Sequence, residues 1–359
     1  MRILFLFVLL ISVVFLRCQE NPEKVAPPDP PVELAIRGAD LSFLPEIEAY
    51  PTTYRDASGN AVDALDLLKA HGCNTIRIRL WHTPATAHSG LEEVIAFSER
   101  VRSKGMKVWL TVHYSDTWAD PGHQTKPALW SALNLTDLSD SVYNYTKKIV
   151  LKLHPDIIQI GNEINDGFLW PDGQLSVNLP NFIALLKEGV QAVRDFSPTS
   201  NIMIHVAGHD NAAWFYQQLQ DQNVSYDMIG LSYYPFWHGK DLNALKSNLN
   251  NLGFTFSKEV LIAETSYPFT LDWNDWTNNI LGETNQLIPG YAATPEGQKQ
   301  FLLSLKALIA DTEKGTGFCY WAPEWVAFKG AESTTGSAWE NMALFDFSNK
   351  ALPALNAFE

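Results

Sequence analysis

The sequence is poor in cysteine and in positive charge, and each shortage excludes a class of protein. Its 359 residues contain three cysteines, Cys18, Cys73 and Cys319, whose odd number and wide spacing rule out a disulfide framework and a Cys-x-x-Cys metal site. Lysine and arginine number 26 against 40 acidic residues, which gives a formal net charge of −14. Because phosphate binding requires clustered basic side chains, we expect no nucleic-acid partner.

Apolar runs long enough to span a bilayer are also missing. The apolar stretch at residues 3–16 is too short for that and follows Arg2, which is typical of a signal peptide. It ends at Arg17-Cys18 and resembles a bacterial lipoprotein signal, in which the cysteine becomes the lipidated first residue. Arg17 departs from the small residue usual before that cysteine, so ordinary secretion is the alternative.

The expected organisation therefore has three parts. Residues 1–17 form a signal peptide, residues 18–33 form the lipid-anchor cysteine and a proline-rich tether, and residues 34–359 form one catalytic domain. We expect an exported monomer, held at the outer membrane or cell surface through Cys18, whose only membrane contact is that anchor.

From residue 34 onward, strand-like and helix-like patterns alternate. The strand-like segments are residues 35–40, 75–81, 106–113, 157–163, 201–206, 228–234, 260–265 and 317–321, and helix-like segments include residues 61–71, 92–104, 142–153, 182–196, 212–222, 242–252 and 294–314. This alternation predicts an α/β fold, the closed (β/α)8 TIM barrel. A doubly wound open sheet is the alternative, but it would need a glycine-rich phosphate turn after the first strand, and residues 38–41 offer none.

Two of the strand-like segments end at a carboxylate, Glu163 in one and Glu264 in the other. In a barrel, the carboxyl ends of the strands meet at the face where chemistry takes place. Two carboxylates that face each other across a cleft are the minimum needed to cleave a glycosidic bond. Taken alone, either glutamate is more typical of a helix-cap neighbour or a solvated loop, but the pair favours a glycosidase.

Polar and aromatic residues mark the other strand ends. They are Asp40, Arg77, Arg79, Trp81, His113, Asn162, His205, Tyr233, Tyr234 and Trp321. Arg77 and Arg79 share one face of a strand, where buried arginines need carboxylate partners; a salt bridge at the rim is the alternative. The loop after the third strand, with Asp116 and Trp118, is of the kind that binds ligands on a rigid scaffold.

Tryptophan is abundant, with twelve residues in the chain. Six follow predicted strands: Trp81, Trp118, Trp170, Trp237, Trp321 and Trp325. The apolar face of a sugar packs on an aromatic ring as other CH groups do. A single such tryptophan would more often be core packing, but six at strand ends favour a sugar-binding cleft.

Five stretches carry a family resemblance. They are residues 37–42 (RGADLS), 113–121 (HYSDTWADP) with Gln124, Lys126 and Pro127, 161–164 (GNEI) with 169–171 (LWP), 229–236 (IGLSYYPF) and 263–268 (AETSYP). With these motifs the chain resembles glycoside hydrolase family 53, the endo-β-1,4-galactanases. The resemblance implies retaining endo-hydrolysis of β-1,4-galactosidic bonds in galactan and type I arabinogalactan by double displacement, without a catalytic cofactor.

The resemblance also implies roles for residues. Glu163 would be the acid/base and Glu264 the nucleophile, and Asn162 would hold the sugar 2-hydroxyl. Arg77 would keep Glu264 ionised by lowering its pKa, and Tyr233 or Tyr234 would donate a hydrogen bond to it. Further substrate contacts are expected from Asp40, His113, Asp116, Trp118, His205, Trp81, Trp170, Trp321 and Trp325. The family often has His-Leu-Asp-Asn-Gly after the fifth strand, whereas this chain reads HVAGHDN at residues 205–211.

Some family members hold a calcium ion between the seventh and eighth strand–helix loops. The resemblance implies such a structural ion here, with ligands Asp272, Asn274, Asn278, Ser337 and Glu340. Trp276 stands where those members have a histidine, and a plain Asx-rich loop is the alternative.

Two rival functions stay open at this point. A surface protein that captures glycans uses similar aromatic platforms without catalysis, although the presence of both glutamates argues against it. A related barrel enzyme acting on β-mannan or β-glucan differs in pocket shape, which the sequence separates only through the resemblance.

Overall fold

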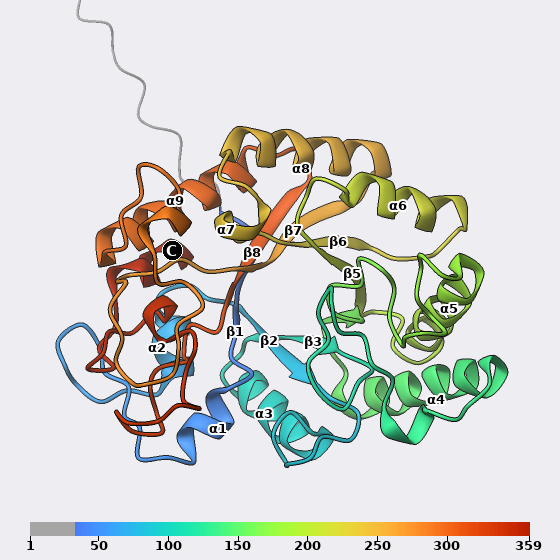
Figure 1. Cartoon of the computed structure of the whole chain (residues 1–359), viewed down its shortest axis with the longest axis horizontal. Helices are drawn as coiled ribbons and strands as arrows, with labels where there is room; N and C mark the ends of the chain where they lie inside the picture. Colours follow the sequence, from blue (N-terminus) through green and yellow to red (C-terminus); the bar gives the residue numbers. More distant parts are fainter. Residues whose placement is uncertain (1–32) are drawn as a thin grey trace, which may run out of the picture. The chain divides into compact units, whose positions relative to one another are not determined.

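The computed structural model describes residues 33–359 (Figure 1). The predicted signal peptide, Cys18 and nearly all of the predicted tether lie outside the described residues. Within residues 33–359, no helix has the length and apolar character needed to cross a membrane.

The strands close into a barrel in which every neighbouring pair is parallel. They are β1 (Ile36–Asp40), β2 (Thr75–Leu80), β3 (Lys107–Val112), β4 (Ile157–Ile160), β5 (Asn201–Ala207), β6 (Met228–Ser232), β7 (Glu259–Thr265) and β8 (Gly315–Trp321). Closure occurs where Ile36 of β1 pairs with Gly317 of β8, and a Cβ at Gly317 would lie 2.0 Å from the Ile36 carbonyl oxygen. The predicted closed barrel is confirmed, and the open sheet is excluded.

Helices surround the barrel as an outer ring (Figure 1). They are α1 (Leu44–Glu48), α2 (Ala64–Ala70), α3 (Leu91–Ser103), α4 (Leu135–Leu153), α5 (Leu179–Phe196), α6 (Ala212–Asp221), α7 (Pro235–His238), α8 (Leu242–Phe256) and α9 (Pro295–Ala310). Several begin at side chains that cap the free N–H groups, such as Asp63 for α2 and Thr294 for α9. The sequence analysis missed α1 and α7, because one turn of helix gives too little periodicity to detect.

The ends of elements differ from the prediction in two places that matter for the site. Strand β4 ends at Ile160 and β6 at Ser232, so Glu163 and Tyr234 lie in loops that leave the barrel. The helix predicted to reach residue 314 ends at Ala310, because a turn precedes β8.

A separate apolar cluster fills the lower interior of the barrel. Its members are Ile36, Trp109, Ile157, Met203, Met228, Leu261, Ala263 and Cys319, largely from the first halves of their strands. Cys73 and Cys319 are buried free thiols, as the sequence indicates. The guanidinium carbon of Arg77 lies 5.5 Å from the centre of the Trp109 ring, so the polar site begins directly above this apolar floor.

Candidate active site

A cavity of about 730 Å³ lies among the carboxyl ends of the strands and the loops that follow them. The predicted residues that line it are Asp40, Arg77, Arg79, His113, Trp118, Asn162, Glu163, Tyr234, Trp237, Glu264, Trp321 and Trp325. This end of the barrel is where enzymes of this architecture place their active sites. The substrate contacts themselves stay predictions.

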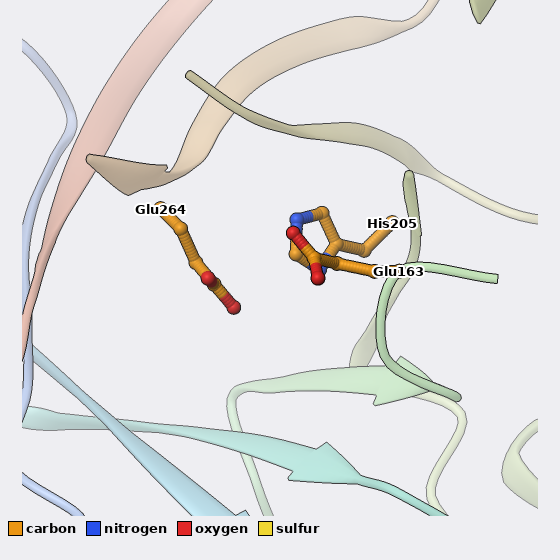
Figure 2. A group of neighbouring side chains, drawn as sticks. All are labelled: Glu163, His205 and Glu264. Carbon is orange, nitrogen blue, oxygen red and sulfur yellow. The ribbon is translucent and has the colours of Figure 1, made fainter. Parts of the chain in front are cut away.

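The two predicted catalytic glutamates face each other across this cavity (Figure 2). One carboxylate oxygen of Glu163, one of Glu264 and a ring nitrogen of His205 lie within 4.8 Å of one another. So short a spacing is typical of retaining glycosidases, whereas inverting enzymes leave room for a water between the carboxyl groups. Glu163 also has a φ of 46°, a left-handed conformation that non-glycine residues seldom adopt and that often occurs at functional sites.

Those three side chains do not form a metal centre. Both ring nitrogens of His205 already have partners, since Nδ1 lies 2.9 Å from the Gln159 side-chain nitrogen and Nε2 lies 2.9 Å from Ser232 Oγ. A metal ligand would need one of these nitrogens free.

Buried Arg77 organises the surroundings of Glu264. Its Nη2 lies 2.8 Å from Glu264 Oε1 and donates to Asn162 Oδ1 at 2.8 Å, and its Nη1 lies 2.7 Å from Asp40 Oδ2. The hydroxyl of Tyr234 donates to Glu264 Oε2 at 3.0 Å. Both oxygens of Glu264 are therefore held by donors, which fixes the carboxylate in one orientation.

The two glutamates differ in how readily they ionise. Although part of Glu163 is open to the cavity, desolvation and then the neighbouring Glu264 charge raise the pKa of Glu163 to about 8. Desolvation also raises the pKa of Glu264, and it outweighs the opposing effect of Arg77. Arg77 acts in the expected direction, because its positive charge lowers the Glu264 pKa against the larger effect of burial. A pKa of about 8 keeps Glu163 protonated at neutral pH.

Aromatic rings follow one another along the cavity. The Arg79 guanidinium lies 4.0 Å from the centre of the Trp118 ring and 4.6 Å from those of Phe43 and Trp81. The series continues from Trp118 to Trp321 at 6.2 Å, from Trp321 to Trp339 at 4.8 Å, and to Trp237, which stacks on Trp339 at 6.1 Å. Trp118 is 36% exposed and Trp237 is 49% exposed, so both rings are open to a ligand.

Three residues predicted to contact substrate do not line the cavity, and their side chains bond to the scaffold. Asp116 accepts hydrogen bonds from the backbone N–H groups of Thr83 and Ala128, each at 2.8 Å. Trp170 donates from Nε1 to the Asp166 carbonyl at 2.9 Å and does not line the cavity. Tyr233 donates to the Gly239 carbonyl at 2.9 Å, so Tyr234 is the tyrosine that reaches the nucleophile.

Two more predicted contacts support other residues instead of lining the cavity. The Trp81 ring packs edge-on against the Trp118 ring, with centroids 5.5 Å apart, and so restricts its orientation. His205 is fully buried below Glu163 and contacts Ser232.

The sequence analysis assigned no role to several residues that contribute to the site. Trp339 and His238 line the cavity, as does Asp120, whose charge adds to the rise in the Glu163 pKa. Ser232 donates to Glu163 Oε1 at 2.5 Å. Asp120 and Ser232 lie within the family motifs quoted above, so the motifs could have identified them. Trp339 lies in a loop to which the sequence analysis assigned only a metal-binding role.

The sequence model for glycosyl hydrolase family 53 matches residues 36–358. The chain belongs to this family. It is 38% identical over 340 residues to the arabinogalactan endo-β-1,4-galactanase of Cellvibrio japonicus, covering 90% of each chain. The family 53 catalytic domain of Ignisphaera aggregans superposes with a TM-score of 0.86 at 38% identity, over 92% of this chain and 97% of that one. A solved fungal β-1,4-galactanase gives a TM-score of 0.79 at 34% identity, over 90% of this chain and 99% of that one.

The raised pKa of Glu163 predicts that this buried group lowers the stability of the folded protein at neutral and alkaline pH. Its folded pKa of about 8 exceeds the ordinary value of 4.5, so the folded protein holds an extra proton between these values and loses stability as pH rises through that window. Glu163→Gln removes the titration, so its melting temperature should match that of the wild type near pH 4 and exceed it by several degrees at pH 8.

The control for this prediction is Glu332→Gln, which removes the same charge from an exposed loop. That variant should show no growing advantage with pH. A difference between Glu163→Gln and the wild type that is the same at pH 4 and pH 8 would contradict the prediction.

Proposed function

We propose that this protein is a retaining endo-β-1,4-galactanase that cleaves galactan and type I arabinogalactan. The observation that carries this conclusion is the pair Glu163 and Glu264, with oxygens within 4.8 Å, set in an aromatic cleft of a family 53 barrel. Relatives with 34% and 38% identity that bear the galactanase name support the choice of galactan over mannan or glucan.

In the first step, Glu163 acts as the acid and Glu264 as the nucleophile. Glu163 gives its proton to the glycosidic oxygen as the bond to the anomeric carbon breaks, and the Glu264 carboxylate attacks that carbon to form a glycosyl ester. Arg77 and Tyr234 favour the ionised form of Glu264 and hold its carboxylate in one orientation, while Glu163 carries the proton. The released chain leaves with the new hydroxyl group.

In the second step, Glu163 is a carboxylate and acts as the base. It takes a proton from a water molecule, whose oxygen attacks the anomeric carbon and displaces Glu264. Two inversions at one carbon return the original configuration. Substrate, water and the two carboxyl groups supply every proton and electron pair, so this chemistry calls for no cofactor.

The arrangement of the aromatic rings supports attack within a polymer. Trp118, Trp321 and Trp325 line the cavity together with Trp237 and Trp339, which offers several stacking platforms to successive sugars. A chain-end enzyme would need only one or two such platforms in a closed pocket. We infer that the cleft accepts internal segments of a chain.

Incubation with β-1,4-galactan, mannan and cellulose tests the proposed function. Galactan alone should release reducing ends, first as a spread of oligosaccharides, with viscosity falling faster than reducing ends appear. Glu264→Gln should reduce turnover at least a thousandfold, on the order expected for a lost nucleophile.

For the acid, Glu163→Gln should be equally poor on galactan, yet an aryl substrate whose leaving group needs no proton should restore the first step. Release of galactose alone from the first minutes would contradict internal attack. Binding of galactan without cleavage by the wild type would favour the glycan-capture alternative.

We propose that a structural calcium ion ties the loops after β7 and β8. Glu340 supports this, because its Oε1 accepts from the backbone N–H groups of Asn274 and Asp275 while its buried Oε2 has no partner in the described part of the chain. The nearby Asn279 Oδ1 and Asn341 Oδ1 are also buried without partners there. Unpaired buried oxygens suit a hard cation.

The predicted ligands would then divide by role. Glu340 would supply a buried carboxylate and Asp272 an exposed one, while Asn274 and Asn278 would add oxygens from a half-buried and an exposed position. Ser337 Oγ donates to the Trp325 carbonyl at 2.6 Å and accepts from Trp339, which leaves it one lone pair. The ion would pin the loops and take no part in the chemistry.

Chelation should lower the melting temperature, because an ion that binds only the folded state stabilises it by mass action. Added calcium should restore the melting temperature, and Glu340→Gln should lose the response to chelator. An unchanged melting temperature, with no metal found by elemental analysis, would exclude the ion.

We propose further that the mature protein is a lipoprotein anchored at Cys18. The support comes from the sequence alone: the apolar run at residues 3–16, the cysteine after it and the proline-rich stretch. A tether of this kind would let a monomeric barrel reach a polymer too large to cross a membrane.

Cys18→Ala should move the protein from the membrane fraction to the soluble fraction without loss of activity. A matched change at Cys73, a buried thiol of the barrel, should leave the membrane fraction unchanged. Persistence of the Cys18 variant in the membrane fraction would reject the anchor.

A further inference from the structure

A buried chain of hydrogen bonds runs beneath Glu163 through three strands. Ser232 of β6, His205 of β5 and Gln159 of β4 are all completely buried. Ser232 Oγ lies 2.5 Å from Glu163 Oε1, His205 Nε2 lies 2.9 Å from Ser232 Oγ, and Gln159 Nε2 lies 2.9 Å from His205 Nδ1. Figure 2 shows the His205 ring directly behind the carboxylate of Glu163.

The strand register brings these side chains together. Ser232 pairs with Ala207 of β5, and His205 lies two residues earlier on the same face of that strand. A register shift between β6 and β7 places Ser232 opposite Glu264 as well. Ser232 therefore lies between the strands that carry the nucleophile and the histidine, at the level of the reacting carboxylates.

The direction of the chain is fixed at Gln159. Its Nε2 also donates to the Gly161 carbonyl at 3.1 Å, and its Oε1 accepts from Arg77 at 3.4 Å. A carbonyl can only accept and a guanidinium can only donate, so the amide has one possible orientation. Its two N–H groups have three acceptors within reach, the Gly161 carbonyl at 3.1 Å, Asn162 Oδ1 at 3.0 Å and His205 Nδ1 at 2.9 Å. The contact with His205 is the shortest, and a proton on Nδ1 would point at the amino group, so we assign Nδ1 as an acceptor from Gln159.

The hydrogen bond from Gln159 determines the tautomer of His205. Its Nδ1 accepts from Gln159, so the single ring proton lies on Nε2 and is donated to Ser232 Oγ. Asn162 Oδ1 lies farther from the same Nδ1, at 3.2 Å, and that oxygen already accepts from Arg77 at 2.8 Å. Burial and then the charge of Arg77 lower the pKa of His205 well below its usual range, so the ring stays neutral.

The direction of the Ser232 hydroxyl hydrogen follows from the protonation of His205. Its oxygen already receives the His205 proton, so its own hydrogen points to Glu163 Oε1. If the acid proton of Glu163 were on Oε1, two hydrogens would meet and this bond would be lost.

We propose that Ser232 is a positioning residue for the reaction, which makes Oε1 of Glu163 an acceptor and leaves Oε2 as the oxygen that delivers and recovers the proton. This inference rests on the proposed function. As the proton leaves, the bond from Ser232 becomes charge-assisted and stabilises the new carboxylate. Ser232 thus opposes the burial and the Glu264 charge that raise the pKa of Glu163.

Ser232→Ala tests the proposal, with Ser232→Thr as the conservative variant. Loss of the hydroxyl should lower kcat/KM on galactan about tenfold, the size expected for a hydrogen bond to a charged group. The fall in kcat/KM at high pH should move to higher pH, because a bond that favours the ionised form is gone. The rate of the first step with a dinitrophenyl galactoside should change little, since that substrate needs no proton.

A merely structural serine would give a different pattern. It would lower kcat/KM equally at every pH and on both substrates, and that result would overturn the proposal. Ser232→Thr should restore the pH profile; Ser232→Cys, a weaker donor of similar size, should lie between alanine and wild type if the threonine variant does not fold. Ser98→Ala is the matched control, because it removes a buried hydroxyl that has no hydrogen-bond partner among residues 33–359.

A readout independent of activity separates this proposal from the proposed function. Titration of the Glu163 carboxyl by carbon NMR should give a higher pKa in Ser232→Ala than in wild type, whatever the substrate. An inactive wild type would defeat the proposed function without deciding this titration. Equal Glu163 pKa values in the two proteins would defeat the role of Ser232.

Discussion

The site depends on the burial of one positive charge, that of Arg77, at the top of the barrel interior. An unpaired ion at such a depth would cost several kcal/mol, on the order of the desolvation penalty of a buried charge. Asp40 and Glu264 compensate the charge at 2.7 and 2.8 Å, and Asn162 takes a further N–H. The apolar floor below, with Trp109 beneath the guanidinium, leaves Arg77 no alternative partners in that direction.

The same balance of charge separates the roles of the two glutamates. One guanidinium serves two carboxylates, so the group carries a net negative charge before Glu163 is counted. Burial is the main reason that the pKa of Glu163 rises to about 8, and the charge of Glu264 adds to it. The ion pairs of Arg77 therefore influence both the scaffold and the acid–nucleophile assignment. Changing Asp40 would be expected to disturb both, because Arg77 would then serve Glu264 alone.

The sequence predicted what depends on patterns along the chain. Strand periodicity and residues at strand ends identified the barrel, Glu163, Glu264 and Arg77, because a parallel barrel brings all strand ends to one face. It could not choose between Tyr233 and Tyr234, since that depends on where β6 ends and how the loop turns. Trp339 was missed because it reaches the cavity from a loop without regular structure. Ser232 was missed because its role depends on partners from β4 and β5.

The histidines of the site share one arrangement that suits a neutral ligand. His113, His205 and His238 each accept a hydrogen bond at Nδ1, from Ala119, Gln159 and Tyr234 respectively. Burial, which is the main cause, lowers the pKa of all three, so each ring is neutral and keeps its proton on Nε2. His113 and His238 line the cavity, where we expect the Nε2–H to donate to a sugar hydroxyl. Because these rings are neutral, the charge of the cleft is set by its arginines and carboxylates, and the site acts when Glu163 is protonated and Glu264 is ionised.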